Sequence, residues 1–152
     1  MKKIYLMIVV LLFASCAKQA PKVEHLHVEG TALMNESGDT VQLSGMSFGW
    51  NVLWPRFYNA SAVKHVVEDW DAEVVRAAIG VEIDDNECVV GNYLKDPDFG
   101  KQCACTIVDA AIENGVYVLV DWHAHGLHTD AAVEFFTYMA TKYKGVPNVI
   151  YE

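Results

Sequence analysis

The chain has 152 residues, of which 53% are hydrophobic and 20% charged, and its 11 Lys and Arg against 20 Asp and Glu give a formal charge of −9. This much apolar side chain supports one packed domain and excludes disorder for the chain as a whole, while the length leaves room for little more than one domain. An acidic chain repels phosphate, and no basic stripe follows the first three residues. The composition therefore argues against nucleic acid as a partner.

The first fifteen residues have the pattern of an export signal. Lys2 and Lys3 form a positive start, residues 4–14 are an apolar run, and small residues precede Cys16. The run is too short for a transmembrane helix, which needs about 20 apolar residues. The position of Cys16 resembles the lipobox of bacterial lipoproteins, in which the cysteine carries lipid and becomes the mature N-terminus; a plain secretory signal is the alternative. A buried N-terminal helix would leave the two lysines unexplained.

Three cysteines remain if Cys16 carries lipid. Disulfides form outside the cytoplasm, but three is an odd number, so at least one of Cys88, Cys103 and Cys105 stays a thiol or pairs elsewhere. Cys103 and Cys105 lie two apart on a predicted helix and point to different faces, and no Cys-x-x-Cys or spaced His pair accompanies them. A zinc site is therefore disfavoured, and both are interpreted as small buried hydrophobic side chains.

A small β-hairpin is predicted at the start of the domain. Residues 25–29 and 40–43 alternate between apolar and polar side chains, and a turn cluster at residues 35–39 separates them. A strand follows over about residues 43–48. The segment beyond it, residues 50–58, is rich in aromatic residues and has the composition of a loop.

The rest of the chain alternates predicted helices with apolar strands. Asn59 or Ser61 caps a helix with apolar residues at helical spacing through residue 70, and Gly115 closes the next helix. The apolar strands do not alternate, which is typical of a parallel sheet buried on both faces. After the first helix, the predicted order is strand 74–79, helix 101–114, strand 116–121, helix 129–143 and strand 147–152.

Strands and helices that alternate in this way form a β/α fold with right-handed crossovers. Residues 43–152 are 110 residues. A (β/α)8 barrel of about 250 residues uses roughly 31 per unit, so the stretch holds about three and a half units. The prediction is an α/β fold, the N-terminal half of a (β/α)8 TIM barrel preceded by the hairpin. A doubly wound sheet is the alternative, but no Gly-x-Gly-x-x-Gly follows any strand.

Arg76 is the first candidate for a functional residue. It lies inside an apolar strand, where its guanidinium needs carboxylate partners or an open cleft. Polar residues near the carboxyl ends of barrel strands face the active site, and a structural ion pair is the alternative.

A second group of candidates ends the predicted strand 116–121. Asp121, Trp122, His123 and His125 follow one another within five residues, and the two histidines are expected to point the same way. No third ligand with suitable spacing is evident, so hydrogen bonding to a polar substrate is favoured over a metal site. His128 is expected in a loop, exposed to solvent.

Four aromatic residues follow the first strand of the predicted barrel: Trp50, Trp54, Phe57 and Tyr58. They are interpreted either as core packing or as platforms for the apolar face of a ligand. Sugars present flat C–H faces and hydroxyl edges. A site made of aromatic residues, His, Arg and carboxylates, without a phosphate-binding device, indicates a carbohydrate substrate.

Several blocks of the sequence resemble glycoside hydrolase family 5 cellulases, in order and across residues 43–152. The most specific are Asp-Trp-His at residues 121–123 and Pro-Asn-Val-Ile-Tyr-Glu at residues 147–152. Other blocks are Leu-Ser-Gly-Met-Ser from residue 43, Trp-Pro-Arg-Phe-Tyr-Asn from 54, Val-Arg-Ala-Ala from 75 and Val-Asp-Ala-Ala-Ile from 108. The resemblance implies a (β/α)8 barrel and endo-hydrolysis of β-1,4-glucan with retention of configuration, without a metal or organic cofactor.

The resemblance places the family's two catalytic glutamates beyond residue 152. In the family the last block continues into an Asn-Glu-Pro motif whose Glu is the acid/base, and the nucleophile Glu lies on the seventh strand. A retaining glycosidase needs both carboxyl groups, about 5–5.5 Å apart. The 152 residues alone are therefore expected to be inactive, and Glu152 is interpreted as a structural residue just ahead of the acid/base.

The resemblance also implies supporting roles for residues that are present. Arg76 is similar to the arginine that holds the nucleophile carboxylate ionised. His123 is similar to the histidine that contacts the sugar on the non-reducing side of the cleaved bond. The expected substrate-binding residues are Trp54, Trp50, Tyr58, Trp122 and His125.

Together these patterns predict the N-terminal part of an exported endo-β-1,4-glucanase. It has a lipoprotein signal peptide over residues 1–15, the lipid-bearing Cys16 and a tether over residues 16–24, and a partial catalytic domain over residues 25–152. The expected partners are β-glucan and, through Cys16, the membrane, with a periplasmic, cell-surface or secreted location. A noncatalytic carbohydrate-binding lipoprotein is the alternative function. Mannan and xyloglucan are alternative substrates, because specificity depends on loops of the other half of the barrel.

Overall fold

The computed structural model describes residues 23–83 and 88–152. The predicted signal peptide, Cys16 and most of the tether lie outside the described residues. In chain order the elements are β1 (Leu26–Glu29), β2 (Ala32–Asn35), β3 (Gly45–Trp50), a 3-10 turn (Pro55–Phe57), α1 (Ala60–Trp70), β4 (Val74–Gly80), α2 (Pro97–Glu113), β5 (Tyr117–His123), α3 (Thr129–Lys142) and β6 (Val149–Tyr151). Within these described ranges, no helix combines the length and the apolar character needed to cross a membrane.

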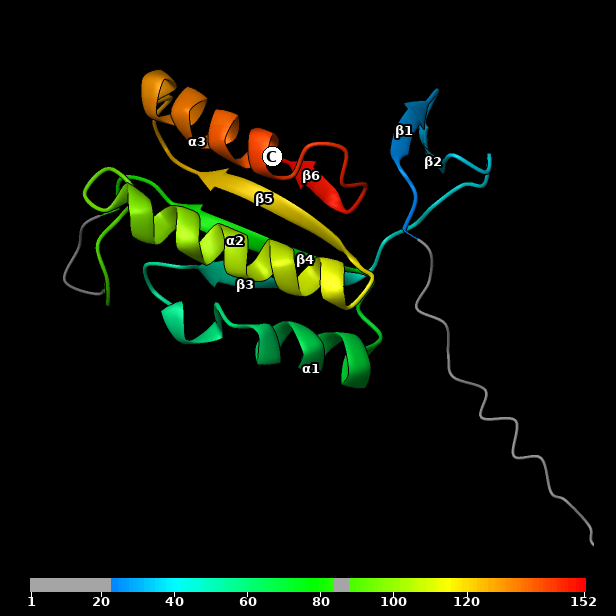
Figure 1. Ribbon diagram of the computed structural model, residues 1–152, viewed down its shortest axis with the longest axis horizontal. Helices are drawn as coiled ribbons and strands as arrows, with labels where there is room; N and C mark the ends of the chain where they lie inside the picture. Colours follow the sequence, from blue (N-terminus) through cyan, green and yellow to red (C-terminus); the bar gives the residue numbers. More distant parts are fainter. Residues whose placement is uncertain (1–22, 84–87) are drawn as a thin grey trace, which may run out of the picture.

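Strands β3, β4, β5 and β6 form one parallel sheet in that order. A helix connects each strand to the next, and the helices cover one face of the sheet, with α2 lying across β4 and β5 (Figure 1). This order of strands and helices is the one that the sequence predicts. It has the arrangement of half a (β/α)8 barrel, in which every crossover is right-handed.

The apolar core lies between this sheet and its helices. Successive side chains of a strand point to opposite faces, so alternate residues of β4 and β5 face the helices and the others face away. The helix side is filled by Val75, Ala77, Ile79, Val118 and Val120 from the strands and by Ile107, Val108, Phe135 and Met139 from α2 and α3. Cys103 and Cys105 are buried in the same core, as the sequence predicts.

Local signals fix the helix ends. Asn59 caps α1, its side-chain oxygen accepting a first-turn backbone N–H at 2.9 Å. Asp96 caps α2 in the same way at 3.1 Å, and Pro97 occupies the first helical position. The second helix therefore starts at Pro97 and not at about residue 101, one turn earlier than its apolar periodicity indicates. Gly115 ends it with φ +67°, in the left-handed region expected after a helix.

A hairpin is present, but its turn and its second strand differ from the prediction: the second strand is β2, and residues 40–43 form no strand. β1 and β2 pair through a two-residue turn at residues 30–31, where Gly30 adopts φ +61°. The Gly, Asn and Asp cluster at residues 35–39 forms a second turn, which brings Thr40 back to a single bridge with Met34. The cluster at residues 35–39 has the composition of a hairpin turn. Gly30 makes residues 30–31 an equally favourable turn, and this turn lies earlier in the chain, directly after β1.

This hairpin is tied to the amino end of the sheet. The Tyr117 hydroxyl, at the start of β5, donates to the backbone carbonyl of Glu24 at 2.8 Å. The Glu24 carboxylate in turn accepts the Ser37 backbone N–H at 3.0 Å. The opposite end of the sheet, where the strands finish, is left clear of the hairpin (Figure 1).

Candidate active site

Charged side chains from three neighbouring strands meet on the sheet face that points away from the helices. Arg76 comes from β4, Asp121 from β5, and Glu152 from the residue after β6. In the parallel register Asp121 pairs with Ala78, one step beyond Arg76 on the same face of β4. The alternation of the strands therefore aligns these three side chains in one row, here called the Arg76 row.

Arg76 holds both carboxylates of the row at once. Its Nη2 lies 2.8 Å from Oδ2 of Asp121 and 3.3 Å from Oε1 of Glu152. Its Nε donates to Oε2 of Glu152 at 2.8 Å, which completes a two-pronged contact with that carboxylate. Such forked pairs are the strongest charge-assisted hydrogen bonds of arginine. Arg76 lies in an apolar strand and needs carboxylate partners there, and these partners are Asp121 and Glu152.

This pairing controls the charge of the row. The hydrogen bond from Arg76 holds the pKa of Glu152 below its usual range, and the same bond raises the pKa of Arg76. Glu152 is therefore a carboxylate held ionised, which suits a structural role and not a proton donor. Burial raises the pKa of Asp121, and the hydrogen bond with His123 and the charge of Arg76 offset part of that effect.

His123 is oriented by the same row. Its Nδ1 lies 2.6 Å from Oδ2 of Asp121, a residue that is only 4% exposed. Because an ionised carboxylate only accepts hydrogen bonds, this contact assigns the proton to Nδ1 and leaves Nε2 for another partner. Asp121 thus fixes both the ring orientation and the tautomer of the imidazole.

Trp50, the last residue of β3, completes the wall beside this histidine. Its ring centroid lies 4.4 Å from that of His123, edge to face, and 5.6 Å from that of His125. The register of β3 against β4 shifts between Ser47 and Trp50, at this point of the strand. The structure therefore brings together Trp50, His123 and His125, next to the Arg76 row and at the carboxyl ends of the strands.

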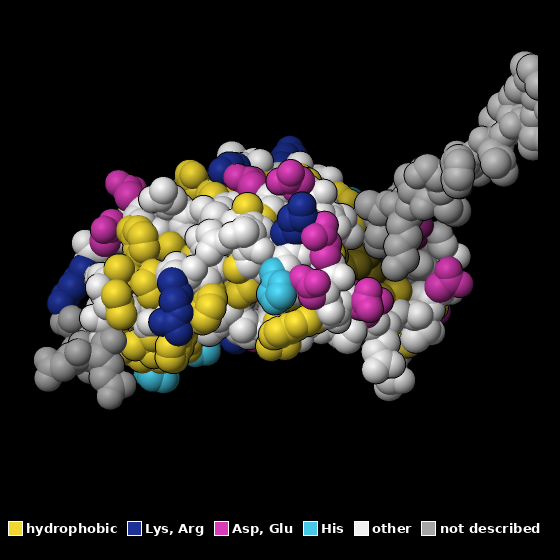
Figure 2. Space-filling view, turned by 90° about the horizontal axis from the view of Figure 1, so that it is seen from below, with side chains coloured by type: hydrophobic (Ala, Val, Ile, Leu, Met, Phe, Trp, Pro, Cys, Tyr) yellow, Lys and Arg dark blue, Asp and Glu magenta, His cyan; other side chains and the backbone are white. Residues whose placement is uncertain are grey.

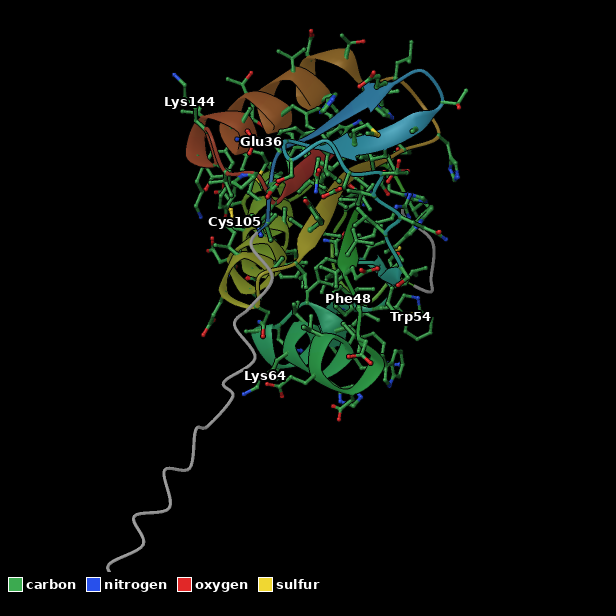
Figure 3. The ribbon with its side chains drawn as sticks, turned by 90° about the vertical axis from the view of Figure 1, so that its right-hand side faces the viewer. Glu36, Phe48, Trp54, Lys64, Cys105 and Lys144 are labelled. Carbon is green, nitrogen blue, oxygen red and sulfur yellow. The ribbon has the colours of Figure 1, made fainter. Side chains whose placement is uncertain are left out.

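Trp54 lies apart from that wall. Its ring contacts are Phe57, at 6.5 Å, and the guanidinium of Arg56, at 4.9 Å. Figure 3 shows Trp54 beside Phe48, above α1, and both line a groove of about 520 Å³ at the β3 edge of the sheet. Hydrophobic side chains gather over α1 and the loop before it (Figure 2). Trp54 is 43% exposed, so it can meet a ligand, but at a different place from Trp50.

The structure corrects the expectation for Tyr58, which is a core residue and not a platform for a sugar. Its side chain is buried, and its hydroxyl lies 2.6 Å from the carbonyl oxygen of Gly49 and 2.8 Å from that of Ala78, so it can donate to either. Burial raises the pKa of the Tyr58 hydroxyl far above its usual value. Tyr58 ties the end of β3 to β4.

Trp122 also differs from the expectation. Because it alternates with Asp121 and His123 along β5, it points to the helix face, where its ring lies 4.8 Å from Tyr93 and 5.3 Å from Phe135. It belongs to the packing under α2 and α3. A sugar bound beside Trp50 would lie on the opposite face of the sheet.

Sequence reasoning attached no structural role to Glu82, just after β4. Its Oε1 accepts the backbone N–H groups of His125 and Gly126, so it holds the loop between β5 and α3. His128, expected to be exposed to solvent, is half-buried: it is the N-cap residue of α3, and its Nε2 lies 3.6 Å from Oε2 of Glu82. The only signal in the sequence is an acidic residue two positions after a buried strand.

No group of three or more His, Cys, Asp or Glu side chains that could hold a metal ion exists in the part of the chain that the structure describes. The imidazole of His123 contacts Asp121, and that of His125 faces the Glu82 carboxylate at 3.8 Å. The arrangement offers hydrogen-bond donors and acceptors beside an aromatic face, which is the chemistry of sugar binding.

Comparison with known sequences identifies the domain. Residues 34–152 match the family model described as Cellulase (glycosyl hydrolase family 5). Endoglucanase Z of Dickeya dadantii is 38% identical over 136 residues, which cover 86% of this chain and 30% of that protein. Endoglucanase A of Evansella cellulosilytica is 37% identical over 120 residues, which cover 76% of this chain and 23% of that protein. The chain thus spans less than a third of the length of these two relatives.

Solved structures share the same fold. A structure from Cytophaga hutchinsonii aligns with a TM-score of 0.77 and 43% identity, over 84% of this chain and 40% of that chain. The catalytic domain of Thermobifida fusca endoglucanase Cel5A aligns with a TM-score of 0.74 and 28% identity, over 85% of this chain and 42% of that chain. The sheet and helices described above are therefore part of a (β/α)8 barrel, and this chain belongs to the cellulase family of glycosyl hydrolases, family 5.

Proposed function

We propose that the protein is an endo-β-1,4-glucanase that cleaves cellulose-like chains with retention of configuration. The Arg76 row, Trp50 and His123 form the sugar-binding half of its site in this proposal. The observation that carries the proposal is the Arg76 row, which reaches the carboxyl end of the parallel sheet at Glu152 and lies beside Trp50 and His123. Active sites of (β/α)8 enzymes lie at that end of the barrel. The family membership and the relatives named endoglucanases support the same activity.

In this proposal Arg76 supplies positive charge to the nucleophile. A guanidinium within a few ångströms of a carboxylate favours its ionised form, and an ionised carboxylate attacks the anomeric carbon of the sugar. Asp121 and Glu152 hold the guanidinium from two sides and fix its position. The nucleophile and the acid/base are the two glutamates that the family resemblance places beyond residue 152.

His123 and Trp50 bind the sugar in this proposal. The tautomer imposed by Asp121 leaves Nε2 of His123 to accept a hydrogen bond from a sugar hydroxyl. The Trp50 ring offers an apolar face next to it, which suits the C–H face of a glucose unit. His125 lies against the same ring and extends the polar edge of this surface.

The test is hydrolysis of a panel of polysaccharides by the protein expressed from the complete reading frame that contains these 152 residues. Carboxymethyl cellulose should be cleaved internally, with a rapid fall in viscosity, and faster than mannan or xyloglucan. Faster hydrolysis of mannan or xyloglucan would show that one of these, and not cellulose, is the substrate. Binding of cellulose without cleavage would contradict the enzyme and favour a noncatalytic carbohydrate-binding protein.

We propose further that the protein is exported and anchored by lipid at Cys16. The support is the sequence: two lysines, an apolar run too short to span a membrane, and small residues before the cysteine. Cys16→Ser should move the protein from the membrane fraction to the soluble fraction, with Cys88→Ser as the matched control. A wild-type protein recovered without lipid and cleaved near residue 15 would indicate a plain secretory signal.

A further inference from the structure

The carboxylate of Glu82 lies outside the Arg76 row and holds a loop. Its side chain is 22% exposed, and Oε1 accepts the backbone N–H groups of His125 and of Gly126, the second at 3.0 Å. Both N–H groups belong to the segment between β5 and α3, residues 124–128, here called the histidine loop. A carboxylate that accepts two backbone N–H groups is a strong local anchor, because such charge-assisted bonds are about twice as strong as neutral ones.

The same carboxylate faces the two histidines of the loop. Nδ1 of His125 lies 3.8 Å from Oε1, and Nε2 of His128 lies 3.6 Å from Oε2. These distances are too long for hydrogen bonds but short enough for attraction when an imidazole is protonated. Oε2 is buried and has no hydrogen-bond partner among the described residues. Burial opposes the ionisation of Glu82, but the two N–H groups and the histidines outweigh it and lower its pKa.

The histidine loop needs an external anchor to keep this shape. His128 has φ +39°, a left-handed backbone conformation that is uncommon for residues other than glycine. A Cβ atom at Gly126 would lie 2.9 Å from Nε2 of His128, so the middle of the loop is packed closely against the side chain of its last residue. Glu82 contacts the loop at both of these places, accepting the backbone N–H groups of His125 and Gly126 and facing the imidazole of His128.

The loop matters because it places His125 next to the ring of Trp50. The imidazole of His125 lies 5.6 Å from the ring of Trp50, while the Glu82 carboxylate contacts the histidine loop itself. We propose that Glu82 is a positioning residue: by anchoring the histidine loop it holds His125 against Trp50 and so sets the affinity of the adjoining sugar subsite. This inference rests on the proposed function.

Glu73 provides a matched control. Its Oε2 accepts the backbone N–H of Ser44 at 3.1 Å and the Ser44 hydroxyl at 3.0 Å, so it is also a carboxylate that anchors a backbone segment. It precedes β4, whereas Glu82 follows it, so the two carboxylates lie at opposite ends of the sheet. Substitution of Glu73 removes an anchor of the same kind far from the sugar.

The experiment compares wild type, Glu82→Ala, Glu82→Gln, His125→Ala, the double variant of Glu82→Ala with His125→Ala, and Glu73→Ala, in the complete protein. Amide hydrogen exchange of residues 124–128 reports the anchor, and kcat and KM on carboxymethyl cellulose report the site. We expect Glu82→Ala to accelerate exchange of the His125 and Gly126 amides at least tenfold and to raise KM about tenfold, with kcat within about twofold. Glu82→Gln keeps an oxygen acceptor and should recover most of both.

The double variant tests whether Glu82 acts through His125. Its KM should equal that of His125→Ala alone, since residues that act through one another are not additive. Glu73→Ala should loosen the Ser44 amide without changing KM. Unchanged exchange in Glu82→Ala, unchanged KM despite faster exchange, or additive effects with His125→Ala would each overturn the inference. A wild-type protein that does not hydrolyse glucan contradicts the proposed function, and with it the effect of Glu82 on sugar binding. Hydrogen exchange still tests separately whether Glu82 anchors the histidine loop.

Discussion

Replacing Arg76 with alanine should damage stability and catalysis by separable amounts. The guanidinium is the partner of Asp121, which is 4% exposed, and of Glu152, whose side chain is 46% exposed. Removing one partner of a buried ion pair costs about 3–5 kcal/mol, whereas an exposed pair contributes about 0–1 kcal/mol. The Arg76 side chain is itself 28% exposed, so water can enter the vacated space and solvate Asp121. We therefore expect the free energy of unfolding to fall by about 3 kcal/mol, the lower end of the buried-pair range.

The catalytic loss has a different origin. If Arg76 keeps the nucleophile ionised and in place, its removal should lower kcat at least a hundredfold, which is about 2.7 kcal/mol of transition-state stabilisation. Urea unfolding measures the first effect, and kcat on carboxymethyl cellulose at a temperature where the variant is fully folded measures the second. Both are measured on the complete protein.

A double variant separates the two effects. Arg76→Ala combined with Asp121→Asn removes the stranded buried charge, so it should recover most of the lost stability while kcat stays low. A fall of less than about 1 kcal/mol in unfolding free energy for Arg76→Ala would show that Asp121 does not depend on this partner. A near wild-type kcat would remove Arg76 from the active site.

Further predictions concern single positions and the chain by itself. His123→Ala should lower kcat and kcat/KM together in steady-state kinetics, and a change in KM alone would reduce its role to ground-state binding. Tyr58→Phe should lower the free energy of unfolding in urea by about 1 kcal/mol and leave KM unchanged, because its hydroxyl serves only backbone carbonyls. The pKa of Glu82 lies below its ordinary value of 4.5, so its contribution to stability is complete above that pH and is lost as the pH falls through the lower, folded-state pKa. Glu82→Gln should therefore flatten the acid side of the stability profile, measured by urea unfolding across that range, and an unchanged profile would contradict the anchoring contacts. Residues 17–152 expressed alone should self-associate in gel filtration, because β3 and β6 are the edges of the sheet and a groove rich in apolar side chains lies beside β3. They should not hydrolyse cellulose, and a cooperative, monomeric and active chain would contradict both parts.

The sheet and helices could be predicted because their signals are local. Unalternated apolar runs, an Asn cap and a closing glycine identify β4, β5, α1 and the end of α2 from short windows of sequence. The hairpin turn was predicted wrongly, since residues 35–39 and Gly30 are both good turns and only the pairing of β1 with β2 chooses between them.

The site was predictable where a physical demand singled out a residue. An arginine in an apolar strand requires carboxylates, and Arg76 has them. Trp122 was misplaced because its neighbours Asp121 and His123 were treated as one motif, although strand alternation puts Trp122 on the other face. The depth of an aromatic residue in a loop depends on what packs over it, so the burial of Tyr58 is not visible in the sequence.

The contacts of Glu82 could not be predicted either. They join a residue after β4 to a loop after β5, more than forty positions away, and they use backbone N–H groups that any sequence would supply. Only the parallel register of the two strands brings them together.

The proposed retaining glucanase site is tested most directly by the configuration of the first product that the complete protein releases from a cello-oligosaccharide. Proton NMR distinguishes the two anomers before they equilibrate. A site of this family acting through a covalent glycosyl intermediate should release the β-anomer first, with the α-anomer appearing later by mutarotation, and Arg76→Ala should abolish the early signal. Release of the α-anomer first, or no cleavage by a folded wild-type protein, would contradict the proposed function.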